Sequence, residues 1–438
     1  MRFFVLIFIF LSAVFAQKIP VLDFEVVKKE GDATAPTLLL IGGIQGDEPG
    51  GFNATNVFSK YYKILSGNVW VVPVLNRHSM LLNHRGVYDD MNRKFATLSQ
   101  KDPEYQLIQD IKTLIVNPQV DVVLHLHDGS GFYRPTYINA NMNPNRWGSC
   151  SIIDQAFLPN SKFPNLDEIV THTILHINQY LLKPEHKYYK RDTQTAKGDI
   201  EMEKALTFFA VRNNKSAFAN EASKNLTVEQ RVYYHLLAIE GIMQQIGIKY
   251  ERQFVLNPQT IYRLINDTKL EVKIEEIIGL PLFGLRSELN FFPLPKKDIH
   301  HIKVESNSHI VGLSLRANQV FLKYGNKLMT KLNPQYTTFD HSLKMVKIKV
   351  DGIKKEVAIG SIIDVKKSFE ILEHEGYRAN VIGFVAPNAN TSKPNEVGIE
   401  ITLQKCQNKF SIDKNGKIFR AEFYKDKDFS GMLLFRFQ

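Results

Sequence analysis

The chain is poor in cysteine, with only Cys150 and Cys406 among its 438 residues. Two cysteines so far apart exclude a disulfide framework and any Cys-x-x-Cys zinc or redox motif, and the sequence leaves open whether they pair with each other. Internal repeats and low-complexity stretches are absent as well. Hydrophobic residues make up 44% and charged residues 23%, which is the composition of a globular protein, and the length favours two or three domains over one.

Long hydrophobic runs are absent after the first residues of the chain. Arg2 precedes an apolar run over residues 3–11, and residues 14–16 (Val-Phe-Ala) stand before Gln17. This order predicts a secretory signal peptide at residues 1–16. Because the apolar run is short for a bilayer span, we expect an exported chain without stable membrane insertion rather than a retained anchor.

Acidic residues are outnumbered: Lys and Arg total 55 against 45 Asp and Glu, a formal net charge of +10. A basic surface favours an acidic partner. The basic residues are spread along the chain without a single stripe, and an exported protein does not meet nucleic acid, so we expect no nucleic-acid partner. An anionic cell-wall polymer fits at least as well, and a basic surface without a dedicated partner stays open.

The first half of the chain alternates strand-like and helix-like patterns, which indicates an α/β fold with a mixed sheet flanked by helices. Apolar runs predict buried strands at residues 38–41, 69–75 and 120–126, and helical periodicity predicts helices at 52–64, 104–116, 166–182 and 228–246.

After residue 250 the pattern is that of two small β-rich domains. Alternating apolar and polar residues predict strands at 271–274, 345–350, 397–403 and 432–437. The sequence thus predicts a signal peptide (1–16), an α/β domain (17–250), a small β-rich domain (251–335) and a β-sandwich-like C-terminal domain (336–438).

Two potential metal ligands follow the first predicted strand. The strand ends in Gly42-Gly43, and Gln45 and Glu48 come next, three residues apart, before Pro49 at a predicted helix start. Ligands at this spacing on a strand-to-helix turn can converge on one ion. Taken alone, a Gln and a Glu in a glycine-rich turn are more often structural.

A third potential ligand, His127, ends the predicted strand at 120–126, where the carboxyl ends of strands collect chemistry. His125 shares its side of the strand, because side chains alternate, and we expect it to support His127 or simply to pack.

Two further segments supply polar groups for binding and proton transfer. Arg85, Asn92 and Arg93 lie close together in sequence, and guanidinium groups bind carboxylates in a bidentate manner. Glu221 has apolar neighbours, which raise the pKa of a carboxyl group toward the range useful to a general base. Each segment alone is equally compatible with a solvated loop or a helix end.

In this order, the motifs resemble those of the zinc metallocarboxypeptidases related to carboxypeptidase A. The step from Arg85 to Asn92 is more similar to the aspartoacylase and desuccinylase branch. The length, the signal peptide, the two C-terminal β domains and the Gln in place of the usual first His look most like the peptidoglycan DL-carboxypeptidases that determine helical cell shape. The family resemblance covers residues 20–250, and only this closer similarity covers the rest.

The resemblance implies Zn2+ held by Gln45, Glu48 and His127, with water in the open position. Zinc would lower the pKa of that water and polarise the scissile carbonyl. The catalytic residues would then be Glu221, which takes the water's proton, and Arg85, which stabilises the oxyanion.

Asn92 and Arg93 would bind the terminal carboxylate of the substrate, which makes the enzyme an exopeptidase. The implied function is a periplasmic DL-carboxypeptidase that removes the terminal meso-diaminopimelate from peptidoglycan tripeptides to leave dipeptides. Its partners would be the muropeptide substrate and, as further candidates, other cell-shape proteins.

Two departures from the family pattern keep alternatives open. An amide oxygen is a weaker zinc donor than imidazole, and residues 197–218 lack the Tyr that many relatives have before the catalytic Glu. A degenerate zinc site would make the chain a non-catalytic cell-wall-binding protein. A small-molecule amidohydrolase like the desuccinylases is the other alternative, which the signal peptide and the β domains disfavour.

Overall fold

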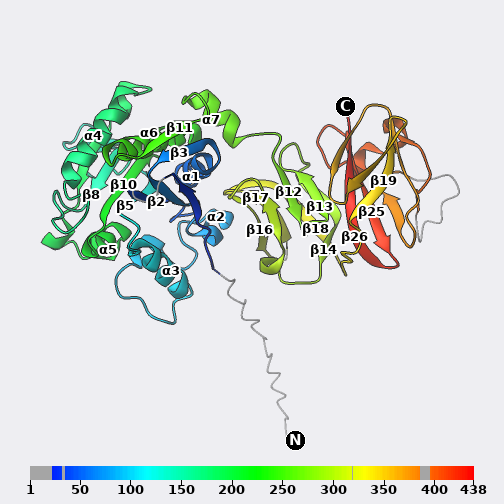
Figure 1. Ribbon diagram of the computed structural model, residues 1–438, viewed down its shortest axis with the longest axis horizontal. Coiled ribbons are helices and arrows are strands. Elements are labelled where there is room, and N and C mark those ends of the chain that lie inside the picture. The colour runs from blue at the N-terminus through cyan, green and yellow to red at the C-terminus, as the bar shows by residue number, and fades with distance from the viewer. Residues whose placement is uncertain (1–21, 32–34, 318, 385–394) are drawn as a thin grey trace, which may run out of the picture.

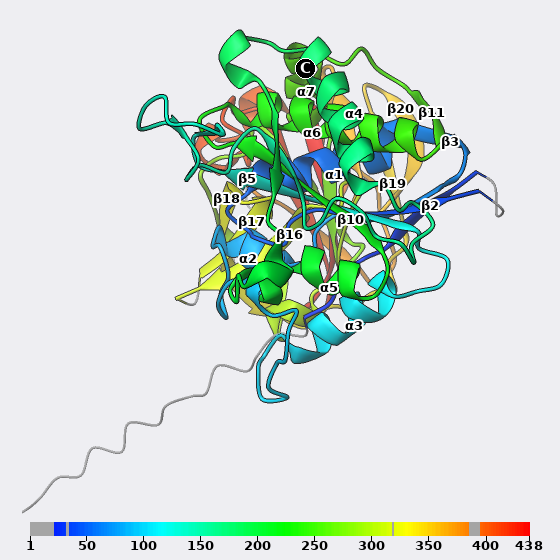
Figure 2. The same ribbon diagram turned by 90° about the vertical axis from the view of Figure 1, so that its left-hand side faces the viewer.

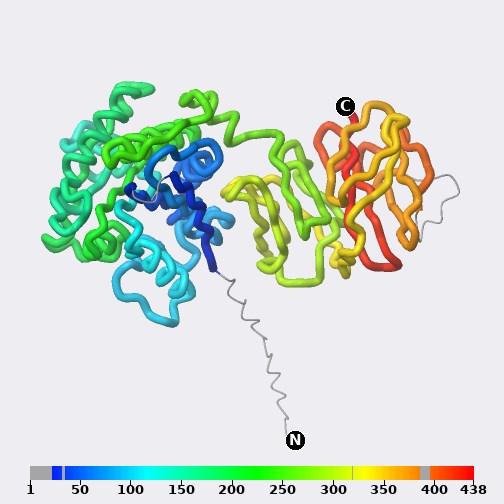
Figure 3. The backbone as a smooth tube through the Cα atoms, in the orientation of Figure 1, coloured from blue at the N-terminus to red at the C-terminus, as the bar shows by residue number. Residues whose placement is uncertain are grey.

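The computed structural model describes residues 22–31, 35–317, 319–384 and 395–438, so the expected signal peptide at residues 1–16 lies outside the described residues. An α/β part is followed by two β-rich parts, which confirms the expected fold class. The three parts lie in a row, and the chain runs through them in sequence order (Figures 1 and 3). Cys150 and Cys406 are both free, and no described helix is long and apolar enough to cross a membrane.

One mixed sheet forms the centre of the α/β part. Its strands are β1 (Val27–Glu30), β2 (Thr37–Ile41), β4 (Asn68–Val72), β5 (Val122–Gly129), β8 (Cys150–Ile153), β9 (Tyr189–Asp192) and β10 (Ser216–Ser223). Their order is β1-β4-β2-β5-β10-β8-β9, and the inner strands β4, β2, β5 and β10 run parallel. β1 and β8 run antiparallel to their neighbours β4 and β10.

Helices cover both faces of this sheet (Figure 2). They are α1 (Pro49–Tyr61), α2 (Arg77–Leu82), α3 (Tyr105–Ile115), α4 (Leu166–Gln179), α5 (Leu206–Arg212), α6 (Val228–Gln245) and α7 (Pro258–Ile265). α1, α4 and α6 pack on one face, and α3 and α5 lie on the other. Local sequence sets the starts: Pro49 occupies the first turn of α1, and Thr227 and Gln230 form a capping box on α6.

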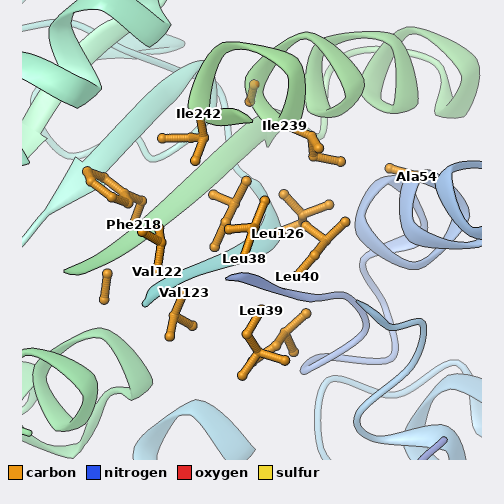
Figure 4. Close-up of a cluster of buried hydrophobic side chains, with 14 of the residues drawn as sticks. Leu38, Leu39, Leu40, Ala54, Val122, Val123, Leu126, Phe218, Ile239 and Ile242 are labelled. Carbon is orange, nitrogen blue, oxygen red and sulfur yellow. The ribbon is translucent and has the colours of Figure 1, made fainter. Parts of the chain in front are cut away.

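The inner strands are buried on both faces. All five residues of β2 are buried, and Leu38 and Leu40 point toward α6, whereas Leu39 and Val123 point to the opposite face (Figure 4). Ile239 of α6 closes one of these two layers. Continuous apolar strands are what a parallel sheet covered on both faces requires. The rigid centre of the α/β part therefore holds the strand ends in fixed positions.

Small strand pairs and the second part complete the arrangement. The pairs are β3 (Tyr62–Ser66) with β11 (Lys249–Arg252) and β6 (Phe132–Tyr133) with β7 (Met142–Asn143). The second part holds one sheet of β13 (Ile278–Pro281), β12 (Glu271–Ile274) and β15 (Val304–Ser306), and one of β14 (Glu288–Pro295), β18 (Lys327–Thr337), β17 (Gln319–Tyr324) and β16 (Val311–Arg316).

Two sheets also form the C-terminal part. One holds β20 (Ile353–Ala358), β19 (Met345–Val350), β22 (Ser368–Ile371) and β24 (Ile401–Thr402), and the other holds β21 (Ile362–Val365), β26 (Asp428–Phe437), β25 (Ile418–Lys425) and β23 (Arg378–Val381). Phe369 of β22 stacks on Phe435 of β26 with ring centroids 3.6 Å apart, so an aromatic core lies between the sheets. The domain boundaries expected near residues 250 and 335 stay predictions.

Several expected elements are wrong at their edges, among them the strand expected at 69–75, which ends at Val72, and the helix expected at 166–182, which ends at Gln179. Residues 62–64, expected as the end of a helix, belong to β3, because this segment alternates buried and exposed residues and pairs with β11. Of the strand expected at residues 397–403, only Ile401–Thr402 pairs. Gly398 has a φ of +77° there, which turns the chain out of the extended conformation.

The α/β part and the second part share one hydrophobic cluster. Phe52 of α1 is fully buried and lies against Gly325, where a Cβ atom would come within 2.7 Å of the Phe52 ring. Arg77 of α2 donates a hydrogen bond of 2.8 Å to the backbone carbonyl of His309. Because α1 follows directly on Glu48, the second part braces the helix that begins at the candidate site.

We expect Phe52→Ala to lower the free energy of unfolding by about 3–5 kcal/mol, because it leaves a cavity in this shared cluster. Urea unfolding of the full chain measures the loss. Phe157→Ala is the matched control, since the Phe157 side chain is exposed and its loss should cost little. Equal losses in the free energy of unfolding for the two substitutions would contradict a stabilising role of Phe52 in this shared cluster.

Candidate active site

The carboxyl ends of β2, β5 and β10 meet at one edge of the sheet because these strands are parallel neighbours. Ile41 at the end of β2 lies beside His125, and His127 lies beside Glu221 of β10. Since side chains alternate along strands, His125, His127 and Glu221 lie on one face of the sheet. Ligands of such sheets bind at this edge.

A cavity of about 270 Å³ lies at this edge. Every site residue predicted from the sequence lines it: Gln45, Glu48, Arg85, Asn92, Arg93, His127 and Glu221. The structure therefore brings together segments that the sequence separates by more than a hundred residues. Their individual roles stay predictions.

A tight turn brings Glu48 to the cavity. Gly43 follows β2 with a φ of +63°, a conformation that favours glycine, and the chain then turns into α1. Glu48 is the N-cap residue of α1 but makes no capping hydrogen bond with its side chain. Its carboxylate faces the cavity instead, where Oε2 accepts a hydrogen bond of 3.2 Å from the backbone N–H of Asp128.

Glu48 and His127 face each other across the cavity floor. His127 Nδ1 lies 3.0 Å from Glu48 Oε2, and both side chains are 4% exposed. Arg85 Nη1 lies 3.0 Å from the other carboxylate oxygen, Glu48 Oε1. One carboxylate and one imidazole nitrogen thus converge on a single point, with a cation beside them.

Gln45 is buried, and the two ends of its amide differ. Nε2 donates a hydrogen bond of 2.8 Å to Asp90 Oδ1. Oε1 is buried without a hydrogen-bond partner among the described residues. A buried polar atom without a partner is costly, so its presence beside Glu48 and His127 points to a ligand at that place.

These atoms fit a divalent metal ion. An amide oxygen, a carboxylate and an imidazole nitrogen are three protein donors, the number that catalytic metal sites use while keeping a position open. In the described part of the chain, no three His, Cys, Asp or Glu side chains are grouped to hold a metal. At this edge the third donor beside Glu48 and His127 is Gln45 Oε1.

Asp90 holds this arrangement together, a role that no sequence pattern predicted. Its Oδ1 accepts from Gln45 and from the backbone N–H of Asn92, and its Oδ2 accepts from Arg85 at 2.9 Å. Burial alone would raise the pKa of Asp90, but the Arg85 charge and the hydrogen bonds outweigh it and lower that pKa. An ionised Asp90 accepts hydrogen bonds only, which fixes the Gln45 nitrogen toward it.

His125 orients the His127 ring from the side away from Glu48. Its Nδ1 lies 2.7 Å from His127 Nε2, and its Nε2 lies 2.7 Å from Thr207 Oγ1. Burial, together with the neighbouring His127, lowers the pKa of His125 well below its usual value, so the ring is neutral. A neutral ring that bonds to Nε2 of His127 leaves Nδ1 facing Glu48, the arrangement that metal-binding histidines use.

Asp128 is a second residue that the sequence analysis missed. Its carboxylate accepts from the backbone N–H of Gly50 at 2.8 Å, from Arg231 at 3.1 Å and from His235 at 3.2 Å. Asp128 thereby ties the first turn of α1 to the end of β5. The position of Glu48 relative to His127 depends on the hydrogen bond between Gly50 and Asp128.

Glu221 is half-buried in the cavity wall, and desolvation raises its pKa to about 8. His127 and Arg85 oppose this shift, whereas the carboxylates of Glu48 and Asp128 add to it. A carboxyl group with a pKa near neutrality can both take up and release a proton, as a general acid–base requires. This is the environment that the apolar neighbours in the sequence predicted.

The other side of the cavity is basic. Arg93 donates to the backbone carbonyl of Asn92 at 3.0 Å, and Asn92 Oδ1 accepts from the backbone N–H of Leu206 at 3.0 Å. Lys224, which the sequence analysis did not single out, lies 2.9 Å from Asp47 and 3.9 Å from Glu48. Arg85, Arg93 and Lys224 make the cavity suitable for an anionic ligand.

We expect Glu221→Gln to flatten the pH dependence of stability in the metal-free protein. A raised carboxyl pKa contributes stability that is present below the unfolded value of about 4.3 and is lost as pH rises through about 8. The wild-type chain should lose on the order of 4 kcal/mol over this range that the variant does not lose. Urea unfolding of chelator-treated protein at pH 5 and pH 8 measures the difference.

Glu201→Gln is the control, because the Glu201 carboxylate is exposed. It should keep the wild-type dependence on pH. The same slope in wild type and Glu221→Gln would show that Glu221 does not titrate as its burial predicts.

Family profiles cover the whole chain. A profile described as carboxypeptidase controlling helical cell shape, catalytic, matches residues 1–266. The beta-barrel domain of carboxypeptidase M99 matches residues 267–338, and the C-terminal domain of metallo-carboxypeptidase matches residues 339–438. No curated protein sequence matches the chain significantly.

Solved structures match over nearly the full length. The apo form of the cell shape determinant Csd4 from Helicobacter pylori is 54% identical, covers 95% of this chain and 100% of its own, and has a TM-score of 0.92. The tripeptide-bound form is 53% identical over 95% of this chain and 100% of its own, with a TM-score of 0.91. The mDAP-bound form, described as a D,L-carboxypeptidase, is 54% identical over 94% of this chain and 100% of its own, with a TM-score of 0.91.

The catalytic profile matches the α/β part, and the solved cell-shape determinant is 54% identical over nearly the whole chain. The chain therefore belongs to the family of metallo-carboxypeptidases that control helical cell shape.

Proposed function

We propose that the chain is a periplasmic, zinc-dependent DL-carboxypeptidase that removes the terminal meso-diaminopimelate from peptidoglycan tripeptides and leaves dipeptides. The observation that carries the proposal is the buried, unpartnered amide oxygen of Gln45 beside Glu48 and His127, with Glu221 on the neighbouring strand. The substrate is supported by the relative with bound tripeptide and bound mDAP, which shares more than half of its residues with this chain.

Gln45 Oε1, the Glu48 carboxylate and His127 Nδ1 would hold the zinc ion. When bound, zinc supplies Lewis-acid chemistry, which acidifies water and polarises a carbonyl group. Glu48 and His127 are both buried, so they meet a ligand without competition from bulk water. Asp90 and His125 keep the donor atoms of Gln45 and His127 turned toward the cavity.

Glu221 would move the proton of the reaction. Water adds its oxygen to the scissile carbonyl carbon and gives one proton to the Glu221 carboxylate. Glu221 then passes this proton to the leaving amine as the C–N bond breaks, and a dipeptide carboxylate and free diaminopimelate result. The pKa of about 8 suits both halves of this transfer.

The basic side of the cavity would bind the substrate. Arg93 and the Asn92 amide would hold the terminal α-carboxylate, and Arg85 would stabilise the negative charge that develops on the carbonyl oxygen. Because the substrate must carry a free α-carboxylate on the residue after the scissile bond, the enzyme is an exopeptidase.

Location and partners follow from the sequence. The predicted signal peptide at residues 1–16 supports export to the periplasm, where peptidoglycan lies. The net charge of +10 suits an anionic wall polymer, and an exported protein does not meet nucleic acid, so we expect no nucleic-acid partner. Other cell-shape proteins remain candidate partners of the β-rich parts.

We expect Asp90→Asn to weaken zinc binding about 10- to 100-fold, because an amide at position 90 no longer fixes the Gln45 nitrogen. Gln45→His should bind zinc at least as tightly as wild type, since imidazole is the better zinc donor. Competitive titration with a chromophoric chelator measures both affinities. Asp89→Asn is the matched control: Asp89 is exposed and next in sequence, so its affinity should match that of wild type.

Weaker binding by Gln45→His, or no change in Asp90→Asn, would contradict the ligand role of Gln45. These titrations need no substrate, so they test the metal site separately from the reaction.

The function itself is tested with residues 17–438 and a muramyl tripeptide, with release of free diaminopimelate followed by mass spectrometry. Release should require zinc and should fall about 10²- to 10⁴-fold in Glu221→Gln, the usual effect of losing a general base. Glu201→Gln should retain full activity.

Two other outcomes would redirect the assignment. Zinc-free protein that binds peptidoglycan without releasing diaminopimelate would favour a wall-binding protein with a degenerate site. Hydrolysis of small N-acyl amino acids, with no action on the muramyl tripeptide, would favour a small-molecule amidohydrolase.

A further inference from the structure

A long excursion of the chain leaves the cavity wall and returns to it. Ser130 and Trp147 both line the cavity, and residues 131–146 run between them. The root is fixed, because the backbone N–H of Trp147 donates to the carbonyl of Ser130 at 3.2 Å. The Arg191 guanidinium also stacks 3.6 Å from the centroid of a Trp147 ring. The two ends of the excursion therefore border the cavity on a rigid base.

The excursion has no charged residue over residues 135–145, in a protein in which 23% of residues are charged. This stretch, Pro-Thr-Tyr-Ile-Asn-Ala-Asn-Met-Asn-Pro-Asn, has Asn at every second position from 139 to 145. The cavity itself is lined by Arg85, Arg93 and Lys224. Arg134 and Arg146 flank the stretch, and Arg146 Nε donates to the carbonyl of Ala140 at 2.8 Å. The side chains of residues 135–145 are themselves uncharged and rich in amides, so they suit a different part of a ligand than the basic cavity does.

Hydrogen bonds hold the tip of the excursion in one conformation. Asn139 Oδ1 accepts from the backbone N–H groups of Asn141 and Met142 at 2.9 and 3.0 Å. Asn143 Nδ2 donates to the carbonyls of Asn139 and Ala140 at 2.9 and 3.0 Å. The fixed backbone reduces the entropy that ordering the tip on a ligand would cost.

This tip presents an aromatic and an aliphatic side chain to solvent. Tyr137 is 72% exposed and Ile138 is 57% exposed. Single exposed apolar residues are common, but an adjacent exposed pair on a fixed loop whose two ends line a cavity is typical of an interaction surface. A tyrosine ring combines an apolar face with a polar hydroxyl, which suits a ligand with C–H faces and hydroxyl groups.

The proposed substrate is longer than the cavity. In a muramyl tripeptide, alanine, glutamate and a lactyl group separate the terminal residue from the sugar, a span on the order of 10 Å when extended. A cavity of about 270 Å³ accommodates the terminal residue, and the sugar then lies outside, at the rim. The sugar is uncharged and carries hydroxyl and N-acetyl groups, which the uncharged side chains of residues 135–145 match and the basic cavity does not.

We propose that residues 135–145 form a sugar-binding surface, in which the Tyr137 ring packs on the muramyl sugar and Ile138 contacts its N-acetyl methyl group. This inference rests on the proposed function and extends it: the enzyme recognises the glycan as well as the peptide. The free tripeptide is then a poorer substrate than the muramyl tripeptide.

The test compares kcat/KM for N-acetylmuramyl tripeptide and for the same tripeptide without sugar. Wild type should prefer the muramyl substrate about five- to tenfold, a typical contribution of one aromatic contact. Tyr137→Ser should lose this preference while keeping the wild-type rate on the free tripeptide. Tyr137→Phe, which keeps the ring, should retain most of the preference.

Tyr262→Ser is the matched control, because Tyr262 is an exposed tyrosine on α7. It should leave the preference unchanged. The rate on free tripeptide reports the folding of each variant, and Ile138→Ser carries the test if Tyr137→Ser does not fold. Equal rates of wild type on the two substrates, or an equal loss on both in Tyr137→Ser, would overturn the sugar-binding surface. No turnover of either substrate by wild type would overturn the proposed function, and the sugar-binding surface would fall with it.

Discussion

The hydrogen bond from the Gln45 amide to Asp90 is the interaction on which the rest of the site depends. An amide has a donating end and an accepting end, and a partner that can only accept, such as an ionised carboxylate, fixes which end faces the cavity. Arg85 keeps Asp90 ionised, and the same Arg85 reaches Glu48. The orientation of the Gln45 amide, the ion pair of Glu48 with Arg85 and the position of the Asn92 backbone are therefore set together. A histidine at position 45 would need less of this support, because either ring nitrogen of a neutral imidazole can act as an acceptor.

Support for this arrangement comes from two directions. Asp128 fixes the first turn of α1 to the end of β5, and Phe52, in the same helix, packs into the core shared with the second part. Glu48 stands at the start of that helix, so its carboxylate is positioned by the sheet and by a β-rich part far away in sequence. This gives the second part a structural role in the α/β site, whatever it also binds. The apolar sheet supplies a rigid base in which every residue of β2 is buried.

Much of the fold could be predicted because its signals are local, whereas the candidate ligands came from short motifs that are weak alone and gain their roles from the family resemblance. Apolar runs and helical periodicity marked β2, β5, α3 and α6, and the strand ends then located His127 and Gln45. The strand that carries Glu221 was not predicted, because its polar Asn220 is satisfied by Ser151 and His235, which are distant in sequence. Asp90 and Asp128 were missed for the same reason: their partners are set by the tertiary fold.

The most direct test of this account is a crystal structure of the zinc-loaded protein with anomalous data at the zinc edge. The account predicts one strong peak at bonding distance from Gln45 Oε1, a Glu48 oxygen and His127 Nδ1, with the Gln45 nitrogen still bonded to Asp90. A peak bonded to Glu48 and His127 but remote from Gln45, or a Gln45 amide turned with its nitrogen toward the ion, would contradict it.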